Sequence, residues 1–410
     1  MLHQLPEEIL KKVGCLLFQD DVVSLMLTCS RFYNLFQPRL YSVICIDATP
    51  ELFHNDSQSL KEFSHYCNMY KLNGEFIQAV KITSIYSLKA FFKSVENENA
   101  QYVNMLMMNK LPDVPDLEML YYLQKSLPLM SRLQVFEWWH DIDVPLSLLK
   151  NNSRLYRIGG FIKSDMNENE SFSNLKEMVL TRAVASPPKD LTKLTLRNFD
   201  LNTFNFDFGK IRDLTIENCC YKRDYLLKQD LKNIEHFAID VADDPKLIDL
   251  VSTLKLKTLT VKTRTNINKI LASNHDVTSL SLSKINIAYL KPLVKFSNLK
   301  YLNLSILEKD IFELLPHIPL QVKFISLNVL ETTERNNCLL AEEYWQCTTD
   351  QNRLKYQDFV LEYHRKINML NWIMFNGNGK HYVFECNDVS PVIYRDGFES
   401  YFEKLVNTLV

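Results

Sequence analysis

Glycine is scarce in this 410-residue chain, with only eight copies. That scarcity disfavours glycine-rich phosphate-binding loops and flexible linkers. The nine cysteines form no Cys-x-x-Cys pair, so neither a zinc knuckle nor a thioredoxin-like redox motif is predicted. They are odd in number and irregularly spaced, which is typical of buried thiols in a reducing compartment.

Long apolar runs and an excess of one charge are also missing. No stretch approaches 18 consecutive apolar residues, so no membrane span is expected. Lys11 and Lys12 interrupt the apolar stretch near the N-terminus, which argues against a signal peptide. The 47 Lys and Arg residues face 49 Asp and Glu residues, so no basic field predicts nucleic-acid binding. We expect a cytoplasmic or nuclear protein without membrane or nucleic-acid partners.

Enzyme signatures are absent from the sequence as well. No G-x-S-x-G or H-E-x-x-H motif occurs, and Gly377-Asn-Gly379-Lys380 lacks the spacing and the hydroxyl residue of a P-loop. His140 and Asp141 are neighbours in sequence, which is not the geometry of a catalytic triad, and His140 is expected at a strand end or on the surface. We therefore predict a non-enzyme with no catalytic residues, no metal site and no cofactor.

The first 44 residues contain three short apolar patterns at helical spacing. Pro6 stands where a first helical turn accepts a missing N–H, and Asp20 and Ser30 are placed to cap a second and a third helix. Pro38 is expected to discourage continuation of the third. The apolar positions are Ile9, Val13, Leu16 and Leu17, then Val22, Leu25, Met26 and Cys29, then Phe32, Leu35 and Phe36. Helices this short need further apolar burial, against the rest of the chain or against another protein.

The order of these residues resembles an F-box. The match runs without a gap through Leu5-Pro-Glu-Glu-Ile-Leu10, Asp20-Asp-Val-Val-Ser-Leu25 and Thr28-Cys-Ser-Arg-Phe-Tyr-Asn-Leu35. In that family the motif docks on the small Skp adaptor of a cullin–RING ubiquitin ligase. The resemblance implies that an adaptor-binding surface comprises Leu5, Pro6, Ile9, Leu17, Val22, Leu25 and Phe32. An amphipathic lead-in that packs on the main domain is the alternative, but it does not explain the order of turn, cap and aromatic residues.

Two positions depart from the usual F-box pattern. Gly14 is a poor helix former inside the first predicted helix. Phe32 stands where many family members have Trp, which keeps a large aromatic ring and loses its N–H.

The remaining sequence repeats one short pattern: apolar, two other residues, apolar, one other residue, apolar. Eight runs end at Leu180, Leu196, Ile216, Ile239, Val261, Leu282, Leu304 and Leu327, at separations of 16, 20, 23, 22, 21, 22 and 23 residues. These separations lie within or near the roughly 20–29-residue period of leucine-rich repeats. Each run predicts a strand with two inward apolar side chains, and the residues between runs return the chain so that the strands stack in parallel. Residues 43–47, 79–83 and 133–138 predict further strands of this kind.

The repeats are degenerate, because the Asn or Cys expected three positions after the last apolar residue occurs only as Cys219. Irregular outer segments are therefore expected, with helix between residues 87 and 127. An unrelated α/β domain with similar strands is the alternative, which eight occurrences at near-constant spacing disfavour. We predict a mixed α/β fold: a three-helix F-box at residues 1–44, a leucine-rich-repeat-like solenoid with a parallel sheet at 45–334, and a C-terminal α+β cap at 335–410.

The capping segment has patterns of its own. Residues 341–370 are rich in aromatic residues at helical spacing, and residues 370–386 predict a hairpin with an Asn-Gly turn. Residues 397–410 predict a short amphipathic helix. Repeat arrays need a terminal cap over their last open core, and a recognition pocket is the alternative role.

The residues between the inward apolar positions are expected on the concave side of the solenoid. The central row is Val179, Thr195, Thr215, Ala238, Thr260, Ser281, Asn303 and Ser326. Its flanks include Glu217, Asp240 and Asn328 and the predicted substrate-binding residues Trp139, Lys193, Arg197, His236, Lys262, Tyr301 and Phe324. Tyr, Trp and Arg are enriched in binding hot spots, so this row is the predicted substrate surface. The alternative is that small β-compatible residues tile a solvated sheet face.

An F-box followed by such repeats resembles the F-box/LRR class of substrate receptors. The resemblance implies a non-catalytic subunit of an SCF ubiquitin ligase, with the Skp adaptor, cullin bound through it, and a protein substrate as partners. The substrate would be ubiquitinated by other subunits and degraded. The alternative is an F-box scaffold in a non-ligase assembly, in trafficking or on chromosomes. The sequence identifies neither the substrate nor a modified degron, and it does not say whether cullin is present.

Overall fold

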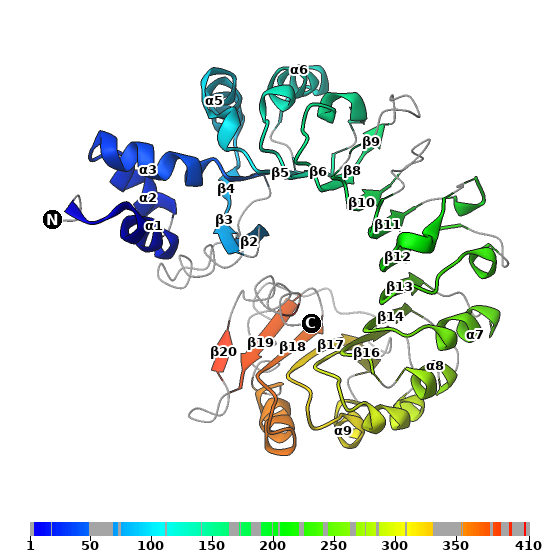
Figure 1. Cartoon of the computed structure of the whole chain (residues 1–410). Helices are drawn as coiled ribbons and strands as arrows, with labels where there is room; N and C mark the ends of the chain where they lie inside the picture. Colours follow the sequence, from blue (N-terminus) through cyan, green and yellow to red (C-terminus); the bar gives the residue numbers. More distant parts are fainter. Residues whose placement is uncertain are drawn as a thin grey trace, which may run out of the picture. The chain divides into compact units, whose positions relative to one another are not determined.

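The chain is a mixed α/β protein built on mostly parallel sheet (Figure 1). The computed structural model describes residues 4–17, 19–48, 69–72, 75–110, 113–140, 142–163, 172, 174–181, 190–198, 200–203, 206–220, 225–240, 245–262, 268–274, 276–283, 287–307, 310–330, 354, 356–377, 380–386, 393–395 and 406. The chain divides into two compact units. The first consists of Met1–Lys210 and Asn218–Cys220, and the second consists of Ile211–Glu217 and Tyr221–Val410. The domain boundaries expected after residues 44 and 334 stay predictions.

The first unit begins with three short helices, α1 (Glu7–Leu16), α2 (Gln19–Met26) and α3 (Ser30–Leu40). Their shared core consists of Leu10, Val22, Met26, Phe32 and Phe36. The Phe32 and Phe36 ring centroids lie 6.1 Å apart. Burial of one such side chain contributes about 1.5–3 kcal/mol, so five of them give only a small core.

The starts of these helices differ from the predicted ones by one or two residues. Pro6 is the N-cap of α1 rather than its first helical residue. α2 already begins at Gln19, so Asp20 lies inside its first turn. Cys29 holds the extended N-cap position of α3, and Ser30 is the first helical residue. The expected side-chain capping by Ser30 is therefore wrong, because an N-cap needs the extended backbone that Cys29 has here.

Pro38 does not end the third helix, contrary to expectation. It lies inside α3, which continues to Leu40. The Tyr41 N–H donates to the Gln37 carbonyl at 3.2 Å, so the last turn closes around the proline. A proline deprives a helix of one donor, and the turn after it can still form.

Gly14 is explained by the packing of α1 on α3. A Cβ atom at this position would lie 2.4 Å from Cε1 of Phe36, a distance that real Cβ atoms essentially never show. Glycine therefore allows the two helices to approach closely, and its low helix propensity is offset by that contact.

A parallel sheet follows the helices in the first unit. Its strands are β1 (Val43–Asp47), β4 (Val80–Ile82), β5 (Met105–Lys110), β6 (Val135–Trp138), β8 (Arg157–Gly160), β10 (Glu177–Leu180) and β11 (Lys193–Arg197). Their order is β11-β10-β8-β6-β5-β1-β4, and each neighbouring pair is parallel. Helices α5 (Ile85–Asn97) and α6 (Asp116–Ser126) lie on one face of this sheet (Figure 1).

Smaller elements complete the first unit. Strands β2 (Met69–Leu72) and β3 (Glu75–Gln78) pair antiparallel, and β7 (Val144–Pro145) and β9 (Ile162–Lys163) pair parallel. Short 3-10 segments are η2 (Asn99–Tyr102), η3 (Leu127–Leu129), η4 (Leu146–Leu149), η5 (Leu201–Thr203) and η6 (Phe208–Lys210).

All five strands predicted for this parallel sheet are confirmed; its strands β5 and β8 were missed, as were the short strands β2, β3, β7 and β9 outside it. The helix expected between residues 87 and 127 is interrupted by β5, whose Met105-Leu-Met-Met run is buried and does not alternate. A parallel strand covered on both faces gives such a continuous apolar run, and Met is also a good helix former. The other missed strand of the sheet, β8, contains Gly159 and Gly160, which carry no strand signal.

The second unit continues the same design. Its strands are β12 (Asp213–Glu217), β13 (His236–Asp240), β14 (Thr258–Lys262), β15 (Ser279–Ser283), β16 (Tyr301–Leu307), β17 (Phe324–Leu330), β18 (Trp372–Gly377), β19 (Lys380–Glu385) and β20 (Ile393–Arg395). They pair in sequence order, parallel from β12 to β18 and antiparallel from β18 to β20. The six strands predicted from the repeats and the β18–β19 hairpin are confirmed.

Helices cover one face of this second sheet (Figure 1). They are α7 (Pro245–Thr253), α8 (Asn268–Ser273) and α9 (Ile311–Leu314), with the 3-10 segments η7 (Leu226–Lys228), η8 (Ile287–Lys295) and η10 (Leu315–His317). Residues 356–366 are also helical, inside the helix predicted at 341–370. The Asn-Gly turn at 378–379 and the helix predicted at 397–410 lie outside the described residues, except for a helical residue 406.

Burial alternates along the strands, as the repeat pattern predicts. On β16, Leu302, Leu304 and Ile306 are buried, whereas Tyr301 and Asn303 are half-exposed. The same alternation occurs on β12, β14 and β15. One face of the sheet therefore packs against helices and the other is open.

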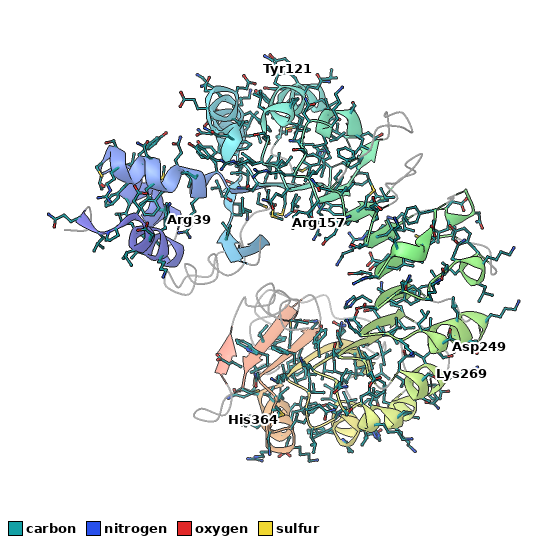
Figure 2. The ribbon with its side chains drawn as sticks, in the orientation of Figure 1. Arg39, Tyr121, Arg157, Asp249, Lys269 and His364 are labelled. Atoms are coloured by element: carbon teal, nitrogen blue, oxygen red, sulfur yellow. The ribbon has the colours of Figure 1, made fainter. Side chains whose placement is uncertain are left out.

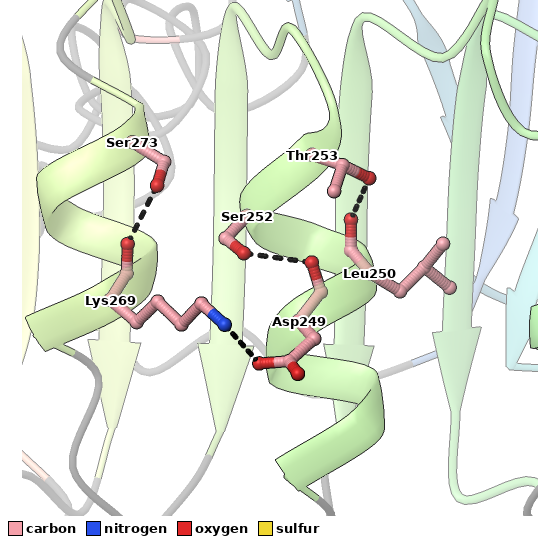
Figure 3. Close-up of polar contacts among 6 residues, drawn as sticks. All are labelled: Asp249, Leu250, Ser252, Thr253, Lys269 and Ser273. Atoms are coloured by element: carbon pink, nitrogen blue, oxygen red, sulfur yellow. Dashed lines mark hydrogen bonds and ion pairs between the residues drawn. The ribbon is translucent and has the colours of Figure 1, made fainter.

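The outer helices are held by apolar packing more than by their ion pairs. Lys269 on α8 and Asp249 on α7 form an ion pair of 2.7 Å, but both side chains are about 60% exposed (Figure 3). Such a surface pair contributes at most about 1 kcal/mol. Val251 and Leu271 are fully buried and each stabilises the fold more strongly than that pair.

Asn198 and Asn218 each directly follow a strand. Both have a left-handed backbone conformation, with φ of 52° and 51°. Asparagine tolerates this conformation better than most residues. Both stand two positions after the last apolar residue of their strands, one position earlier than the asparagine sought in the sequence. Cys219, the only match at the expected position, donates its thiol to the Leu196 carbonyl at 3.3 Å.

Gly160, the last residue of β8, provides a test of the first sheet. Its φ is +103°, and a Cβ atom would lie 1.7 Å from the Trp138 carbonyl oxygen, whereas a Cβ at Gly159 meets nothing closer than 3.4 Å. We expect Gly160→Ala to lower the free energy of unfolding by about 2 kcal/mol or more, and Gly159→Ala by less than about 1 kcal/mol. Urea unfolding of both variants measures the difference. Equal losses in the two would contradict the prediction.

Candidate functional site

Few side chains among the described residues could take part in catalysis. Those discussed below are buried or hydrogen-bonded within the fold. No cluster of three His, Cys, Asp or Glu side chains suited to a metal ion occurs among the described residues. Burial raises the pKa of the Cys386 thiol to about 12, so it carries almost no thiolate at neutral pH. The buried Tyr363 hydroxyl donates to the Ile311 carbonyl at 2.6 Å. His140 follows β6 and accepts from the Ile142 N–H at 3.4 Å, and Asp141 lies outside the described residues.

Cys29, Cys45, Cys219, Cys220 and Cys386 form no disulfide, but the expectation that the cysteines are buried holds only in part. Cys45 and Cys386 are buried, whereas Cys29 and Cys220 are exposed. In the described part of the chain, no helix has the length and apolarity needed to cross a membrane.

The structure places the predicted adaptor-binding residues at three depths. Pro6 and Ile9 are exposed, Leu5, Leu17 and Leu25 pack partly against the helical core, and Val22 and Phe32 are buried in it. Ile9 is 44% exposed, whereas Val22 is 3% and Phe32 6% exposed. In this chain, Val22 and Phe32 hold the helices together, and Pro6 and Ile9 offer surface.

Three exposed apolar residues of the helices were missed from the sequence. Leu27 is 82%, Tyr33 45% and Val23 37% exposed. Leu27 directly follows α2 and falls outside the apolar spacing used to find it, so periodicity gives no signal there. With Ile9, these side chains leave apolar surface on or beside each of the three helices, which is typical of a protein-binding segment.

The open face of the first sheet carries a charged cluster on β6, β8 and β10. Arg157 lies beside Glu177 in register, and its guanidinium nitrogens are 2.7 Å from Glu137 and 3.5 Å from Glu177 (Figure 2). The Glu137 side chain is only 12% exposed. Partly buried pairs of this kind fix side-chain positions more firmly than exposed ones.

Trp139 and Arg197, both predicted to bind substrate, are brought together at this cluster. The Arg197 guanidinium carbon lies 5.3 Å from the Trp139 ring centroid. The indole N–H donates to Glu137 at 3.3 Å. A Cβ atom at Gly159 would lie 3.4 Å from Cζ2 of Trp139, so the glycine gives the ring room to lie across the sheet. Trp139, Arg197, Glu137 and Arg157 are called the tryptophan cluster below.

The other predicted substrate-binding residues are scattered. Lys193 is half-buried on β11, Lys262 is exposed at the end of β14, and Tyr301 is half-buried on β16. The His236 ring nitrogen Nδ1 is hydrogen-bonded to the Thr258 hydroxyl at 2.9 Å. No described contact gathers these four residues into one site.

Phe324 corrects the predicted surface. It is only 1% exposed, so its placement on the open surface is wrong. Its neighbours in register are Tyr301 on β16 and Trp372 on β18. Three large rings therefore share one row, and cross-strand neighbours on one face pack against each other.

A ladder of amides crosses the open face of the second unit. Asn376 Nδ2 donates to Asn328 Oδ1 at 2.7 Å, and Asn328 Nδ2 donates to Asn303 Oδ1 at 3.1 Å. Asn303 Nδ2 donates to the Ser281 hydroxyl at 3.1 Å. The amide ladder (Ser281, Asn303, Asn328 and Asn376) thus joins β15, β16, β17 and β18.

Sequence reasoning found three of the four members of this ladder. Ser281, Asn303 and Asn328 were expected on the open face, but Asn376 was assigned only to a hairpin. The signal that could have added it is the pairing of β17 with β18, which places Asn328 opposite Asn376. Asn303 is in register with Ser326 rather than with Asn328, so the bond between Asn328 and Asn303 runs diagonally between β17 and β16.

The two open faces offer different chemistry. The tryptophan cluster combines an aromatic ring with fixed charges, which suits hot-spot contacts to a protein. The amide ladder is uncharged and presents donors and acceptors, which suits hydrogen bonds to a polar chain. Neither arrangement provides a nucleophile beside a base, so binding is the activity that these faces support.

The Trp139–Arg197 contact is testable by a double-mutant cycle. We expect Trp139→Ala and Arg197→Ala to show a coupling energy of about 0.5–1 kcal/mol in urea unfolding, because the cation lies over the ring. The matched control pairs Trp139→Ala with Lys193→Ala, at the other end of β11, and its coupling should be near zero. Equal couplings in the two cycles would show that stacking is not the cause.

Comparison with known proteins adds no relative to this description. A scan against models of protein families found no match, and a search of curated proteins found no significant match. The functional argument therefore starts from the three helices, the open sheet faces and the residues on them.

Proposed function

We propose that this chain is the substrate-recognition subunit of an SCF ubiquitin ligase. Its N-terminal helices would act as an F-box that binds the Skp adaptor, and the strand repeats would act as a degenerate leucine-rich-repeat domain that binds a protein substrate. The observation that carries the proposal is the ungapped pattern from Leu5 to Leu35, on three short helices that leave apolar side chains exposed.

The exposed residues of the helices support adaptor binding. A small core leaves Ile9 and Leu27 in water, and burial of such side chains against a partner is favourable by about 25 cal/mol per Å² of apolar surface. Pro6 fixes the entry to α1, because its carbonyl accepts from the N–H groups of Ile9 and Leu10 at 3.1 and 3.0 Å. The buried Val22 and Phe32 would act indirectly by holding α2 and α3 in place.

The strand repeats support substrate binding. Strands recur with the spacing read from the sequence, pair in parallel, and carry helices on one face only. Arrays of this kind bind partners on the surface that their stacked units leave open. Here that surface carries the tryptophan cluster in one unit and the amide ladder in the other.

A tight junction joins the helices to the first sheet, which suits a receptor that must hold its substrate in place. Only Tyr41 and Ser42 separate α3 from β1. The Tyr41 hydroxyl is 2.8 Å from Ser94 Oγ, and Gln37 Nε2 donates to Asn99 Oδ1 at 2.7 Å in a buried bond. These bonds tie α3 to α5 and η2, so the helices and this sheet move together.

The proposed mechanism is proximity. Tethering a substrate to the ligase raises the effective concentration of its lysines near the ubiquitin-loaded enzyme, and a rigid tether limits the positions they visit. Ubiquitin transfer would be carried out by other subunits, so this chain needs no catalytic residue of its own.

Adaptor binding is tested by replacing exposed helix residues. We expect Pro6→Ala with Ile9→Ala to weaken binding of purified Skp adaptor by about tenfold or more, since both residues are exposed and their loss leaves the helical core intact. Tyr86→Ala on α5 is the matched control, because Tyr86 is apolar and 83% exposed on another part of the same unit. Adaptor binding that is unchanged in the double variant, or lost equally in the control, would contradict the F-box assignment.

The ligase and the non-ligase assembly are separated by what copurifies with the intact chain. Adaptor together with cullin supports the ligase, and a protein that the Pro6/Ile9 variant still captures is a candidate substrate. Adaptor without cullin would favour a scaffold in another assembly. Absence of both would reject the proposal.

A further inference from the structure

A cavity of about 600 Å³ lies where the helices of the first unit meet its strands. Its walls come from α1, α3 and β3, from Ser42 just before β1 and from Asn104 just before β5. Small-molecule sites usually measure about 300–1,000 Å³, so this cavity has the size of a ligand site.

The walls of this cavity carry an excess of positive charge. Lys11, Arg31 and Arg39 line it, and among the described lining residues Glu7 is the one carboxylate that faces them. The whole chain has a formal charge of −2, so this local excess is not a reflection of the overall composition. An anion that enters this cavity would be attracted by the positive charges on its walls.

Two of these cations are held in place by the fold. Arg31 Nη2 donates to the Leu5 carbonyl at 3.0 Å. A guanidinium nitrogen of Arg39, on α3, would lie 3.2 Å from a Cβ at Gly14, so this side chain lies against α1 (Figure 2). Guanidinium groups with fixed positions recognise phosphate oxygens well, because less side-chain entropy is lost on binding.

The remaining lining suits an organic phosphate. Asn34 brings an amide group, whereas Asn104 Nδ2 already donates to Ser42 Oγ at 3.1 Å and to the Tyr102 carbonyl at 2.9 Å and serves to fix the wall. Apolar atoms come from Phe36 and Ile77, among others. Ligand sites typically combine apolar walls with a few convergent polar groups.

We propose that this cavity binds a small phosphorylated molecule that carries at least two negative charges. Three cations match the phosphate oxygens, and the apolar wall takes the carbon part. A bound ligand contacts α1, α3 and the sheet residues at once, so it stiffens the junction between the helices and the sheet. This inference does not depend on the proposed ligase function.

The test uses inorganic pyrophosphate as the probe and the intact chain as the protein. We expect pyrophosphate to raise the midpoint of thermal unfolding and to give a saturable calorimetric binding curve, whereas sodium chloride at equal ionic strength does neither. Lys11→Gln should weaken pyrophosphate binding about tenfold or more, because a charged hydrogen bond is lost. Asn34→Asp should weaken it as well, since it adds a negative charge to the wall.

Lys12→Gln is the matched control. Lys12 is the next residue on α1, is exposed and does not line the cavity. It should bind pyrophosphate like the wild type, and all three variants should unfold near the wild-type midpoint without ligand, because Lys and Gln have similar helix propensities and Asn34 is exposed. Absence of binding to the wild type, or equal weakening by Lys11→Gln and Lys12→Gln, would overturn the proposal.

Discussion

The parallel, one-to-one register of the strands is the constraint on which the rest of the structure depends. Each strand from β12 to β18 pairs with the next so that apolar residues meet on the helix-covered face, and the other face carries polar residues together with the row of Tyr301, Phe324 and Trp372. A slip by one residue would exchange the two faces, so burial of residues such as Leu302 and Leu304 fixes the register. Once the register is fixed, it also determines which residues of neighbouring strands lie side by side on the open face.

Much of this arrangement could be predicted from the sequence, because it repeats. A single run such as Leu299–Leu304 is ambiguous, but eight runs at near-constant spacing define strands, their parallel pairing and their buried positions. β5 and β8 were missed for opposite reasons: β5 is apolar at every central position, and β8 contains two glycines. The ends of the first helices were also misjudged, because a cap depends on backbone conformation that neighbouring residues decide, as at Cys29 and Pro38.

The candidate sites were less predictable than the fold. The row of outward residues could be named from periodicity, but partners across strands could not. Trp139 meets Arg197 across β8, a strand that was not foreseen, and passes Gly159 at van der Waals distance. Phe324 had the right spacing for the open face and is nevertheless covered, because burial depends on neighbours far away in the sequence. The cavity beside Lys11 depends on helix packing that Gly14 permits, which no local pattern reveals.

The amide ladder has a consequence of its own. Every donor in the row points the same way, from Asn376 through Asn328 and Asn303 to Ser281, so the row has a head and a tail. Hydrogen bonds arranged head to tail polarise one another, which strengthens the Ser281 hydroxyl as a donor at one end. A polypeptide is directional too, since its carbonyls and N–H groups follow a fixed order. A segment lying along the row would therefore be bound preferentially in one of its two orientations, and reversing its sequence would weaken the complex even though its composition is the same.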